Sequence, residues 1–526
     1  MDDKLIVYKP MYFADKADCG YCHGSKADSG NYYALKSWYQ YLSANRKDDA
    51  TSDKATIRSC TVGFQCESMP VENYDRMCNM GFRRSGLFVY KTDPLRNCCR
   101  LYTIRTTPGE VELTKELRKC INRYRTHLGL NKMEPPKDIE ESQYKFVNDI
   151  VSVEAQVENS TFHTKFGPAI YTDEKYELFV KYQELIHNDY DHSKKGFKRF
   201  LCDAPFSKAV IMGTEEEWEQ LNNWKTMKTG EKLLRVGPVH ESYYHNGKLI
   251  ALAITDFLPS GISSVYFIWH PDYHKWSLGK LSALRELALL EKSNLDYYYL
   301  GYYIEDCKKM KYKANYGGEL LDTSTERYYS IKQVNLMIQE GKLFIMGDTT
   351  KEYTREPPLN DAFDKCSFRD TIEIQKGTTA NEKMGNVVER VYGTNSRVFE
   401  PSYLQETVRV LNDYGVDYDI NQRPKDKFRL ENTMSNQEIA SDDITPNFNI
   451  PLILPGIVPL WELRELLETN RLQRQLVAKT LIFDMHTASM RLFGPWEYED
   501  NDTKTAVCNV VRLLGLEMAS HSIIAV

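Results

Sequence analysis

The stretch VHESYYHNGKLIALAITDFLP, from Val239 to Pro259, decides the fold class that we expect for this chain. Asn246 and Gly247 form a strong tight-turn signal between two strand-like apolar runs, so the stretch predicts a β-hairpin. Downstream come a further strand, SSVYFIW, a long helix, SLGKLSALRELALLEKS, and a buried strand, LDYYYLGYY. Because strands and a helix follow one another in this order, the sequence predicts a mixed α/β (α+β) layer.

The composition is that of an ordinary soluble globular protein. The 526 residues exceed what one compact core usually holds, so two or three domains are expected. A protein whose whole surface coats nucleic acid would be basic, and the formal net charge of −6 argues against that class. A local basic face stays possible, because the average hides how the charges are distributed.

Neither a targeting signal nor a membrane span is expected. The first residues, MDDKLIVYKPMYF, start acidic, and their apolar run is too short for a signal peptide. The apolar stretch NIPLILPGIVPLWEL, Asn449 to Leu463, is broken by three prolines and is too short to cross a bilayer. We therefore expect a cytoplasmic protein without membrane contact, with the nucleus as a second location.

The chain divides by composition into three expected domains. Most of its twelve cysteines lie before the polar, proline-bearing stretch NKMEPPKDIEES, Asn131 to Ser142, which we interpret as a linker. After it, Thr172 caps an amphipathic helix, and a late helix is expected in PLWELRELLETNRLQRQLVAKTL. We expect a metal-binding domain at 1–135, an α/β core at 136–345, and an extension at 346–526 that packs on the core.

Four cysteines form the most specific chemical pattern of the N-terminal part. Cys19 and Cys22 stand in CGYC, and Cys98 and Cys99 are adjacent in RNCCRLY. Four thiolates suit zinc or an iron–sulfur cluster, and a reducing location disfavours a disulfide framework. Adjacent cysteines can share one metal only if the backbone turns there, since neighbouring side chains of a strand point apart. The alternatives are that CGYC binds nothing, or pairs with Cys60, Cys66 or Cys78.

The residues around these cysteines resemble a known family. The stretch from Tyr74 to Arg105, YDRMCNMGFRRSGLFVYKTDPLRNCCRLYTIR, is similar, together with CGYC, to the N-terminal domain of the arginyl-tRNA–protein transferases. Several later stretches resemble that family's transferase domain: FVKYQELIHND, the run from Gly237 to Tyr273, SLGKLSALRE, and YYYLGYYIEDCKKMKYKANY. The resemblance covers residues 15–125 and 170–320, and the length and divergent C-terminal part resemble fungal members.

The resemblance implies transfer of arginine from Arg-tRNA to the N-terminal α-amine of proteins that begin with Asp, Glu or oxidised Cys. Such products enter ubiquitin-dependent degradation through the N-degron pathway, so Arg-tRNA, these proteins and the ubiquitin-ligase machinery are the expected partners. It also implies that Cys19, Cys22, Cys98 and Cys99 hold one zinc ion or one iron–sulfur cluster, and the sequence does not choose between them. Residues 1–135 would recognise the acceptor N-terminus, and residues 136–345 would form a GNAT-like transferase core.

This reaction makes demands that particular residues could meet. The site must position amine and ester, stabilise a tetrahedral oxyanion and protonate the ribose oxygen, and it needs no covalent nucleophile. Arg83 and Arg84 are candidates for binding the acceptor's acidic side chain, or are solvated or tRNA-facing charges. Asp256 ends an apolar strand and is either a site carboxylate or a turn cap.

The strand that precedes Asp256 carries two more candidates. His240 should lie near Asp256 across the hairpin, where it could shuttle a proton, or it is a core histidine satisfied by a backbone carbonyl. Tyr243 on the same strand is a candidate substrate-binding residue, or a packing residue.

Two lysine-rich stretches beside aromatic residues are candidates for tRNA contact. Such patches suit phosphate contact and base stacking on an unpaired acceptor end, although lysine runs are often only solvated faces. The candidate tRNA-binding residues are Lys194, Lys195, Lys198 and Arg199 in HSKKGFKRF, and Lys308, Lys309, Lys311 and Lys313 in CKKMKYK.

Two other functions compete with arginine transfer. The loop HPDYHKWSLGKL resembles the phosphate-binding turn of GNAT acetyltransferases, which would make the protein an N-acetyltransferase. Only Gly279 remains of that turn's glycines, and Lys280 and Leu281 would crowd the cofactor, so we expect no acetyl-CoA. The second alternative is a non-catalytic metal-binding adaptor that recognises acidic N-termini.

Overall fold

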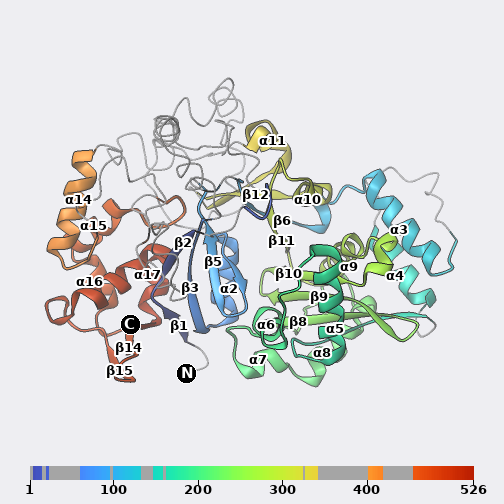
Figure 1. Cartoon of the computed structure of the whole chain (residues 1–526), viewed down its shortest axis with the longest axis horizontal. Coiled ribbons are helices and arrows are strands. Elements are labelled where there is room, and N and C mark those ends of the chain that lie inside the picture. The colour runs from blue at the N-terminus through green and yellow to red at the C-terminus, as the bar shows by residue number, and fades with distance from the viewer. Residues whose placement is uncertain are drawn as a thin grey trace.

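A computed structural model describes most of the chain as two sheets that lie side by side (Figure 1). The described residues are 4–14, 19–22, 60–94, 97, 99–131, 146–157, 161–323, 326–341, 401–418, 450 and 454–526. The fold is mixed α/β, as the sequence predicts. Three stretches lie largely outside the described residues: the expected linker, residues 346–445, and residues 23–59, which separate CGYC from the later cysteines.

The first sheet joins the two ends of the chain. Its eight strands run in the order β15-β14-β16-β1-β3-β5-β4, with β2 paired to β3. They are β1 (Leu5–Tyr8), β2 (Met11–Ala14), β3 (Cys60–Ser68), β4 (Arg83–Ser85), β5 (Phe88–Thr92), β14 (Leu481–Asp484), β15 (Ser489–Leu492) and β16 (Ser522–Ala525).

The second sheet contains the predicted hairpin, β8 and β9, next to its edge strand β7. Its order is β13-β12-β6-β11-β10-β9-β8-β7. The strands are β6 (Tyr102–Thr106), β7 (Phe162–Pro168), β8 (Gly237–His245), β9 (Lys248–Leu258), β10 (Gly261–Trp269), β11 (Tyr297–Tyr303), β12 (Glu319–Asp322) and β13 (Arg327–Ser330). The turn between β8 and β9 has φ angles of 50° at Asn246 and 75° at Gly247, which confirms the tight turn that the sequence predicts.

Strands β10 and β11 pair over only a short length. Their parallel pairing runs from Gly261 to Ser263 on β10, whereas β10 continues to Trp269. A Cβ atom on Gly261 would lie 1.9 Å from the carbonyl oxygen of Tyr297, so only glycine allows this close start. Beyond Ser263 the pairing ends, and we call this place the β10–β11 separation.

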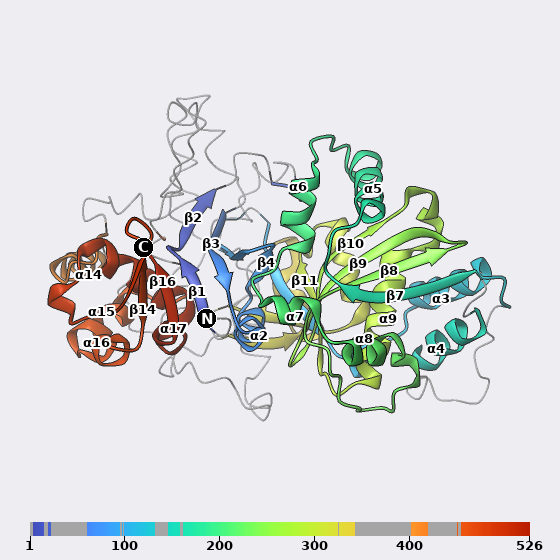
Figure 2. The same ribbon diagram turned by 90° about the horizontal axis from the view of Figure 1, so that it is seen from below.

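Helices cover both faces of the second sheet (Figure 2). The predicted long helix, α9 (Leu278–Lys292), packs with α3 (Lys115–His127) and α4 (Phe146–Val157), while α5 (Asp173–Tyr182) packs on β9 and β10. The Thr172 hydroxyl accepts a hydrogen bond from the Lys175 amide and caps α5, as predicted. The other helices are α2 (Val71–Asn79), α6 (Lys194–Phe197), α7 (Lys208–Met212), α8 (Glu215–Asn222), α10 (Lys308–Lys311), α11 (Ile331–Ile338), α14 (Pro401–Asp413) and α17 (Asn501–Ser520).

The core follows from alternation along β9. Leu252 and Ile254 point toward α5 and pack with Phe179, whereas Ala251 and Ala253 belong to the larger core under α9. Because side chains of a strand alternate between faces, one continuous apolar run fills both layers. Among the described helices, none is both long and apolar enough to cross a bilayer.

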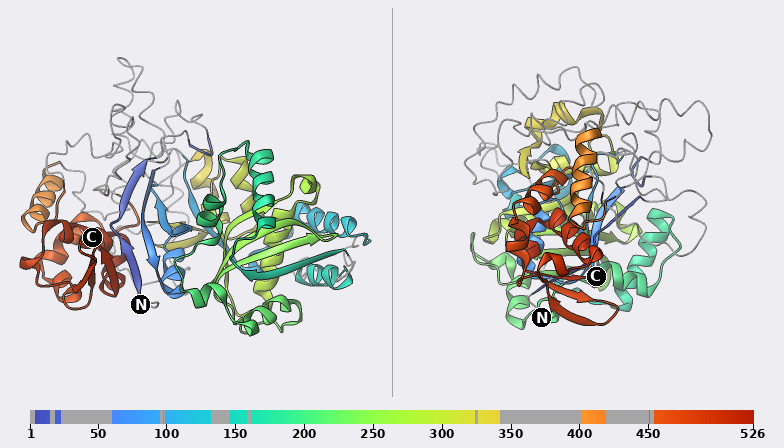
Figure 3. Two further views of the ribbon diagram at one scale, coloured as in Figure 1. Left: turned by 60° about the horizontal axis from the view of Figure 1, so that its bottom comes forward. Right: turned by 90° about the vertical axis from the view of Figure 1, so that its left-hand side faces the viewer.

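The strand pairings cross the predicted domain boundaries. Strand β6 lies within the predicted domain 1–135, yet it sits between β11 and β12 in the second sheet. We expect the extension to pack on the α/β core, and in the structure its strand β16 pairs in parallel with β1 of the first sheet (Figure 3). The physical reason is that the edge of β1 carries backbone N–H and C=O groups that need partners, and β16 supplies them.

The late helix is also different from the prediction. It is broken into α15 (Leu460–Glu468) and α16 (Arg471–Leu476). Asn470 between them has a φ of 57°, in the left-handed region, which ends the first helix.

Candidate functional site

Two glycines of the motif GFRRSG place strand β4 against the second half of the chain. Gly86 has a φ of +59°, and a Cβ atom there would lie 2.1 Å from the backbone oxygen of Arg199. Gly81 has a φ of +92°, and its Cβ would lie 2.9 Å from the Leu321 side chain. Both positions therefore require glycine, and together they hold the two arginines between them close to the second sheet.

Arg84 and Asp256 form a buried, bidentate ion pair across the two halves of the chain. Arg84 Nη2 donates to Asp256 Oδ1 at 2.6 Å, and Nε donates to Oδ2 at 2.7 Å. Arg84 Nη1 also donates to the backbone oxygens of Gly86 and Asp203. Burial alone would lower the pKa of Arg84, but Asp256 holds it above its usual value. The pair thus fastens β4 to β9, and neither predicted site residue is free for a ligand.

Arg83 next to it has no such partner. Its side chain is 6% exposed, and Nη1 donates to the backbone oxygens of Cys78 and Phe82 at 2.9 and 2.6 Å. Nε and Nη2 have no hydrogen-bond partner among the described residues. The guanidinium carbon lies 5.9 and 5.7 Å from the ring centres of Tyr299 and Tyr302. The structure therefore separates the two predicted anion-binding arginines into a paired one and an unpaired one.

His240 does not lie where a proton shuttle could work. It faces Ile254 in the hairpin register, whereas Asp256 faces Pro238. Its Nε2 donates to the Leu201 backbone oxygen at 2.8 Å, which leaves Nδ1 to accept from Lys175 Nζ at 3.1 Å. Burial, with the nearby lysine, lowers the pKa of His240 to about 3. The predicted catalytic role is therefore corrected: His240 is a neutral core histidine satisfied by a backbone carbonyl.

Tyr243 is likewise a core residue and not a substrate contact. It is fully buried, and its hydroxyl donates to Glu241 Oε2 at 2.8 Å and accepts from Arg285 Nη1 at 2.9 Å. Arg285 also forms ion pairs with Glu154 and Glu241. Sequence reasoning did not find this buried charge network, although Arg285 and Glu286 inside the apolar helix SLGKLSALRELALLEKS were a signal for it.

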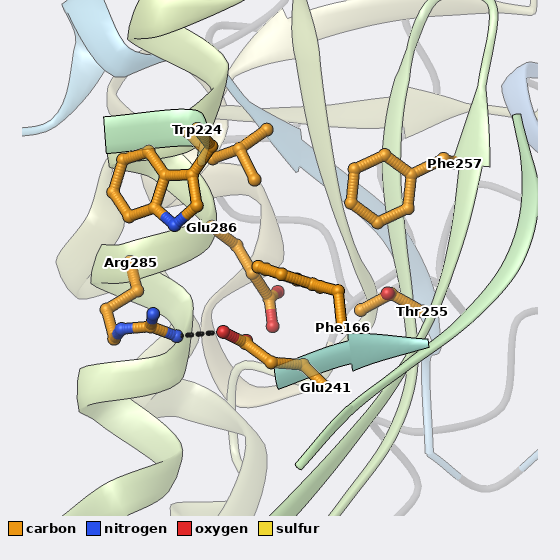
Figure 4. A pocket seen from close by; sticks show the side chains of 8 residues that line it. Phe166, Trp224, Glu241, Thr255, Phe257, Arg285 and Glu286 are labelled. Atoms are coloured by element: carbon orange, nitrogen blue, oxygen red, sulfur yellow. Dashed lines mark hydrogen bonds and ion pairs between the residues drawn. The ribbon is translucent and has the colours of Figure 1, made fainter. Parts of the chain in front are cut away.

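A small pocket lies between this network and the sheet (Figure 4). Glu286 Oε1 accepts from the Ser282 hydroxyl at 2.8 Å, but its Oε2 has no partner among the described residues. Burial, with the nearby Glu241 charge, raises the pKa of Glu286 to about 7. The pocket is lined by Phe166, Trp224, Glu241, Thr255, Phe257, Arg285, Glu286 and Leu289.

The two lysine-rich stretches differ in how they meet solvent. Lys194, Lys195, Lys198 and Arg199 are exposed, and Lys194 Nζ pairs with Asp173 at 2.9 Å. Lys308, Lys309 and Lys311 are exposed as well. Lys313 is not part of that surface: its Nζ turns inward and donates to the Tyr302 backbone oxygen at 2.7 Å. Burial lowers the pKa of Lys313 to about 7, so its prediction as a tRNA phosphate contact is corrected.

Three of the four predicted metal ligands come together. The sulfur atoms of Cys19, Cys22 and Cys99 lie within 4.8 Å of one another. In a tetrahedral zinc site with Zn–S bonds of ~2.3 Å the sulfurs would be ~3.8 Å apart, so this set fits a thiolate-bound metal. Cys98 lies outside the described residues. The rival partners Cys66 and Cys78 are buried elsewhere, Cys66 beside the Ser68 backbone oxygen and Cys78 beside Arg83.

Family comparisons agree with this two-part arrangement. Residues 17–119 match the family model described as "Arginine-tRNA-protein transferase, N terminus", and residues 174–322 match the corresponding "C terminus" model. The fold and the site thus define an aminoacyl-tRNA–protein transferase, with the cysteines and arginines in its N-terminal part and Asp256 in its C-terminal part.

Individual relatives make the class specific. The chain is 45% identical to Arginyl-tRNA--protein transferase 1 of Saccharomyces cerevisiae, over 100% of this chain and 99% of that protein. It is 39% identical to Arginyl-tRNA--protein transferase 2 of Arabidopsis thaliana, over 27% of this chain and 23% of that protein. An Aspartate/glutamate leucyltransferase of Stutzerimonas stutzeri is 25% identical over 48% of this chain and 80% of its own length.

This chain therefore belongs to the arginyl-tRNA–protein transferase family, and it is an arginyltransferase. The membership confirms the resemblance of its motifs and is consistent with a fungal origin. It favours aminoacyl transfer over the two alternatives, an N-acetyltransferase and a non-catalytic adaptor.

A first prediction concerns the cysteines. Replacing Cys19, Cys22 or Cys99 by serine should each lower the metal content of the purified protein, because each removes one thiolate of a shared set. Cys98→Ser should do the same. Cys66→Ser is the matched control, and the metal should be measured by elemental analysis. Full metal retention in a Cys98→Ser, Cys99→Ser protein would exclude the shared site.

A second prediction concerns the Arg84–Asp256 pair. Asp256→Asn should lower the free energy of unfolding by about 3–5 kcal/mol, because it leaves the Arg84 charge buried and unpaired. The double variant Arg84→Met, Asp256→Leu should be close to the wild type, since no charge is then left behind. Urea unfolding of the single variant Asp256→Asn and of the double variant measures this. A stable Asp256→Asn protein that only transfers more slowly would instead make Asp256 a site carboxylate.

A third prediction concerns pH. The pKa of Glu286 is about 7 in the fold against a usual 4.5, so burial favours the protonated form. The folded protein should thus lose stability, on the order of 3 kcal/mol from this group, as the pH rises from 4.5 through 7. Glu286→Gln should remove that part of the slope and be the more stable protein at pH 8, as measured by urea unfolding. Parallel slopes for both proteins would contradict the raised pKa.

Proposed function

We propose that this arginyltransferase moves the arginyl group of Arg-tRNA to the N-terminal α-amine of proteins that begin with Asp, Glu or oxidised Cys. The products would then enter ubiquitin-dependent degradation through the N-degron pathway. The observation that carries the proposal is the Arg84–Asp256 pair, which joins the two family-matched parts of the chain at one place. Because the pair is buried, the two parts act as one unit, and Arg83 stands beside the β10–β11 separation.

The chemistry asks for positioning and charge stabilisation only. The acceptor amine, with an ordinary pKa of ~8, must be neutral to attack the ester carbon. As the new C–N bond forms, the bond to the ribose oxygen breaks, and that oxygen takes a proton. We propose the backbone N–H groups of β10 beyond Ser263, where pairing with β11 ends, as the donors that stabilise the oxyanion.

The cysteines would serve this site by holding the N-terminal part in place. We propose that Cys19, Cys22, Cys98 and Cys99 bind one zinc ion or one iron–sulfur cluster. Such a group supplies four strong bonds that fix the CGYC turn. A brown preparation that bleaches in air would indicate the cluster, and a colourless, stable one would indicate zinc.

The exposed cations would hold the tRNA. Lys308, Lys309 and Lys311 follow β11, and Lys194, Lys195, Lys198 and Arg199 lie on α6 and the π-helical turn after it, so both groups flank the second sheet. We propose that they contact phosphates, which makes tRNA affinity depend on salt. A cytoplasmic and nuclear location, and contact with ubiquitin ligases, are further parts of this proposal.

One experiment tests the function. The protein is incubated with labelled Arg-tRNA, acetyl-CoA and a peptide that begins with Asp, and the product is identified by mass. The expected product carries one added arginine, with no acetylation. An acetylated peptide would indicate the N-acetyltransferase, and peptide binding without turnover would indicate the adaptor.

A further inference from the structure

We propose that Arg83 and Lys313 form the anion subsite that binds the acidic side chain of the acceptor protein. The inference rests on the proposed function and adds to it the residues that read the acceptor. In this proposal Arg84 does not bind the acceptor, because it is paired with Asp256, and Lys313 binds the acceptor in place of tRNA.

The strongest support is the contrast between two neighbouring arginines. Arg84 grips the Asp256 carboxylate with its Nε and Nη2 atoms. The same two atoms of Arg83 are buried and have no hydrogen-bond partner among the described residues. Two parallel N–H groups on one edge of a guanidinium match the two oxygens of a carboxylate or a sulfinate. Nε and Nη2 of Arg83 could therefore bind a carboxylate in the way that the same atoms of Arg84 bind Asp256.

Lys313 supplies a second positive charge at the same place. Its Nζ donates to the backbone oxygen of Tyr302, and the ring of Tyr302 lies 5.7 Å from the Arg83 guanidinium carbon. Within the described part of the chain, neither cation has an ion pair with a carboxylate. Arg83 is buried and the Lys313 contact is partly buried, so the two positive charges repel each other, and an anion would stabilise both. Burial first, and then the positive charge of Arg83, lowers the pKa of Lys313 to about 7.

The subsite lies at the right place for transfer. Arg83 Nη1 is 3.2 Å from Cys78 Sγ, which is 3.8 Å from the Ser263 hydroxyl. Ser263 is the last residue of β10 that pairs with β11. On β11, Gly301 has a φ of +77°, and a Cβ atom there would lie 3.7 Å from Lys313 Nζ. An acidic side chain bound here would leave its own α-amine near the β10–β11 separation, where the ester carbon must come.

The test compares acceptor peptides that differ only in their first residue, Asp or Asn. The variants are Lys313→Met, which removes one cation, and Arg83→Lys, which keeps a charge but loses the two-nitrogen edge. We expect the KM for the Asp peptide to rise about tenfold or more in each, as for the loss of a charge-assisted hydrogen bond. The KM for Arg-tRNA should stay unchanged, and discrimination between Asp and Asn should fall. Lys228→Met, which removes an exposed lysine, is the matched control.

The outcomes separate this subsite from the function itself. A Lys313→Met protein that melts lower but keeps the wild-type KM for the Asp peptide would overturn the subsite and leave Lys313 a structural residue. A raised KM for Arg-tRNA with an unchanged peptide KM would also overturn it. If Arg83→Lys does not fold, calorimetric binding of the Asp peptide to Lys313→Met decides. Failure of the wild type to arginylate any peptide would instead refute the proposed function.

Discussion

The site depends on one buried ion pair. Arg84 of β4 and Asp256 of β9 come from the two sequence parts, and both side chains are almost fully removed from water. Separating a buried ion pair is unfavourable, because a single charge that stays buried without its partner costs several kcal/mol of folding free energy. The pair therefore favours the one arrangement of the two parts in which Arg84 and Asp256 meet.

The position of Arg83 is a consequence of that constraint. Along a strand, neighbouring side chains point in opposite directions, so fixing Arg84 toward β9 directs Arg83 toward the tyrosines of β11. The buried charge of Arg285 on α9 differs from that of Arg83, because it is paired. Arg285 has two carboxylate partners, Glu154 and Glu241. Arg84 and Arg285 thus have carboxylate partners that hold elements together, whereas Arg83 and Lys313 have none within the described part of the chain and lie beside β11.

Much of the second sheet could be predicted from sequence because its signals are local. The Asn246-Gly247 turn, the cap at Thr172 and the apolar run of β11 each depend on a few neighbouring residues. The membership of β6 in that sheet, and of β16 in the other, depends on pairing between residues far apart in sequence, for which no local pattern exists. The cysteine set was found by its motif, and the placement of Cys19, Cys22 and Cys99 agrees with it. Residue type does not reveal the direction in which a side chain points, so the sequence left His240 and Tyr243 between a site role and a core role and grouped Lys313 with the exposed lysines.

The pairing of β1 with β16 has a consequence for how the enzyme is made. One edge of β1 has its hydrogen-bond partners only when β16 pairs with it. At a synthesis rate of roughly 5–20 residues per second, β16 leaves the ribosome about half a minute to two minutes after β1. Throughout that time the edge of β1 lacks this partner, and the nascent chain is exposed to chaperones and to wrong strand pairings. A chain that lacks β16 would leave this edge of β1 unpaired, so the first sheet forms in full only when residues 522–525 are present.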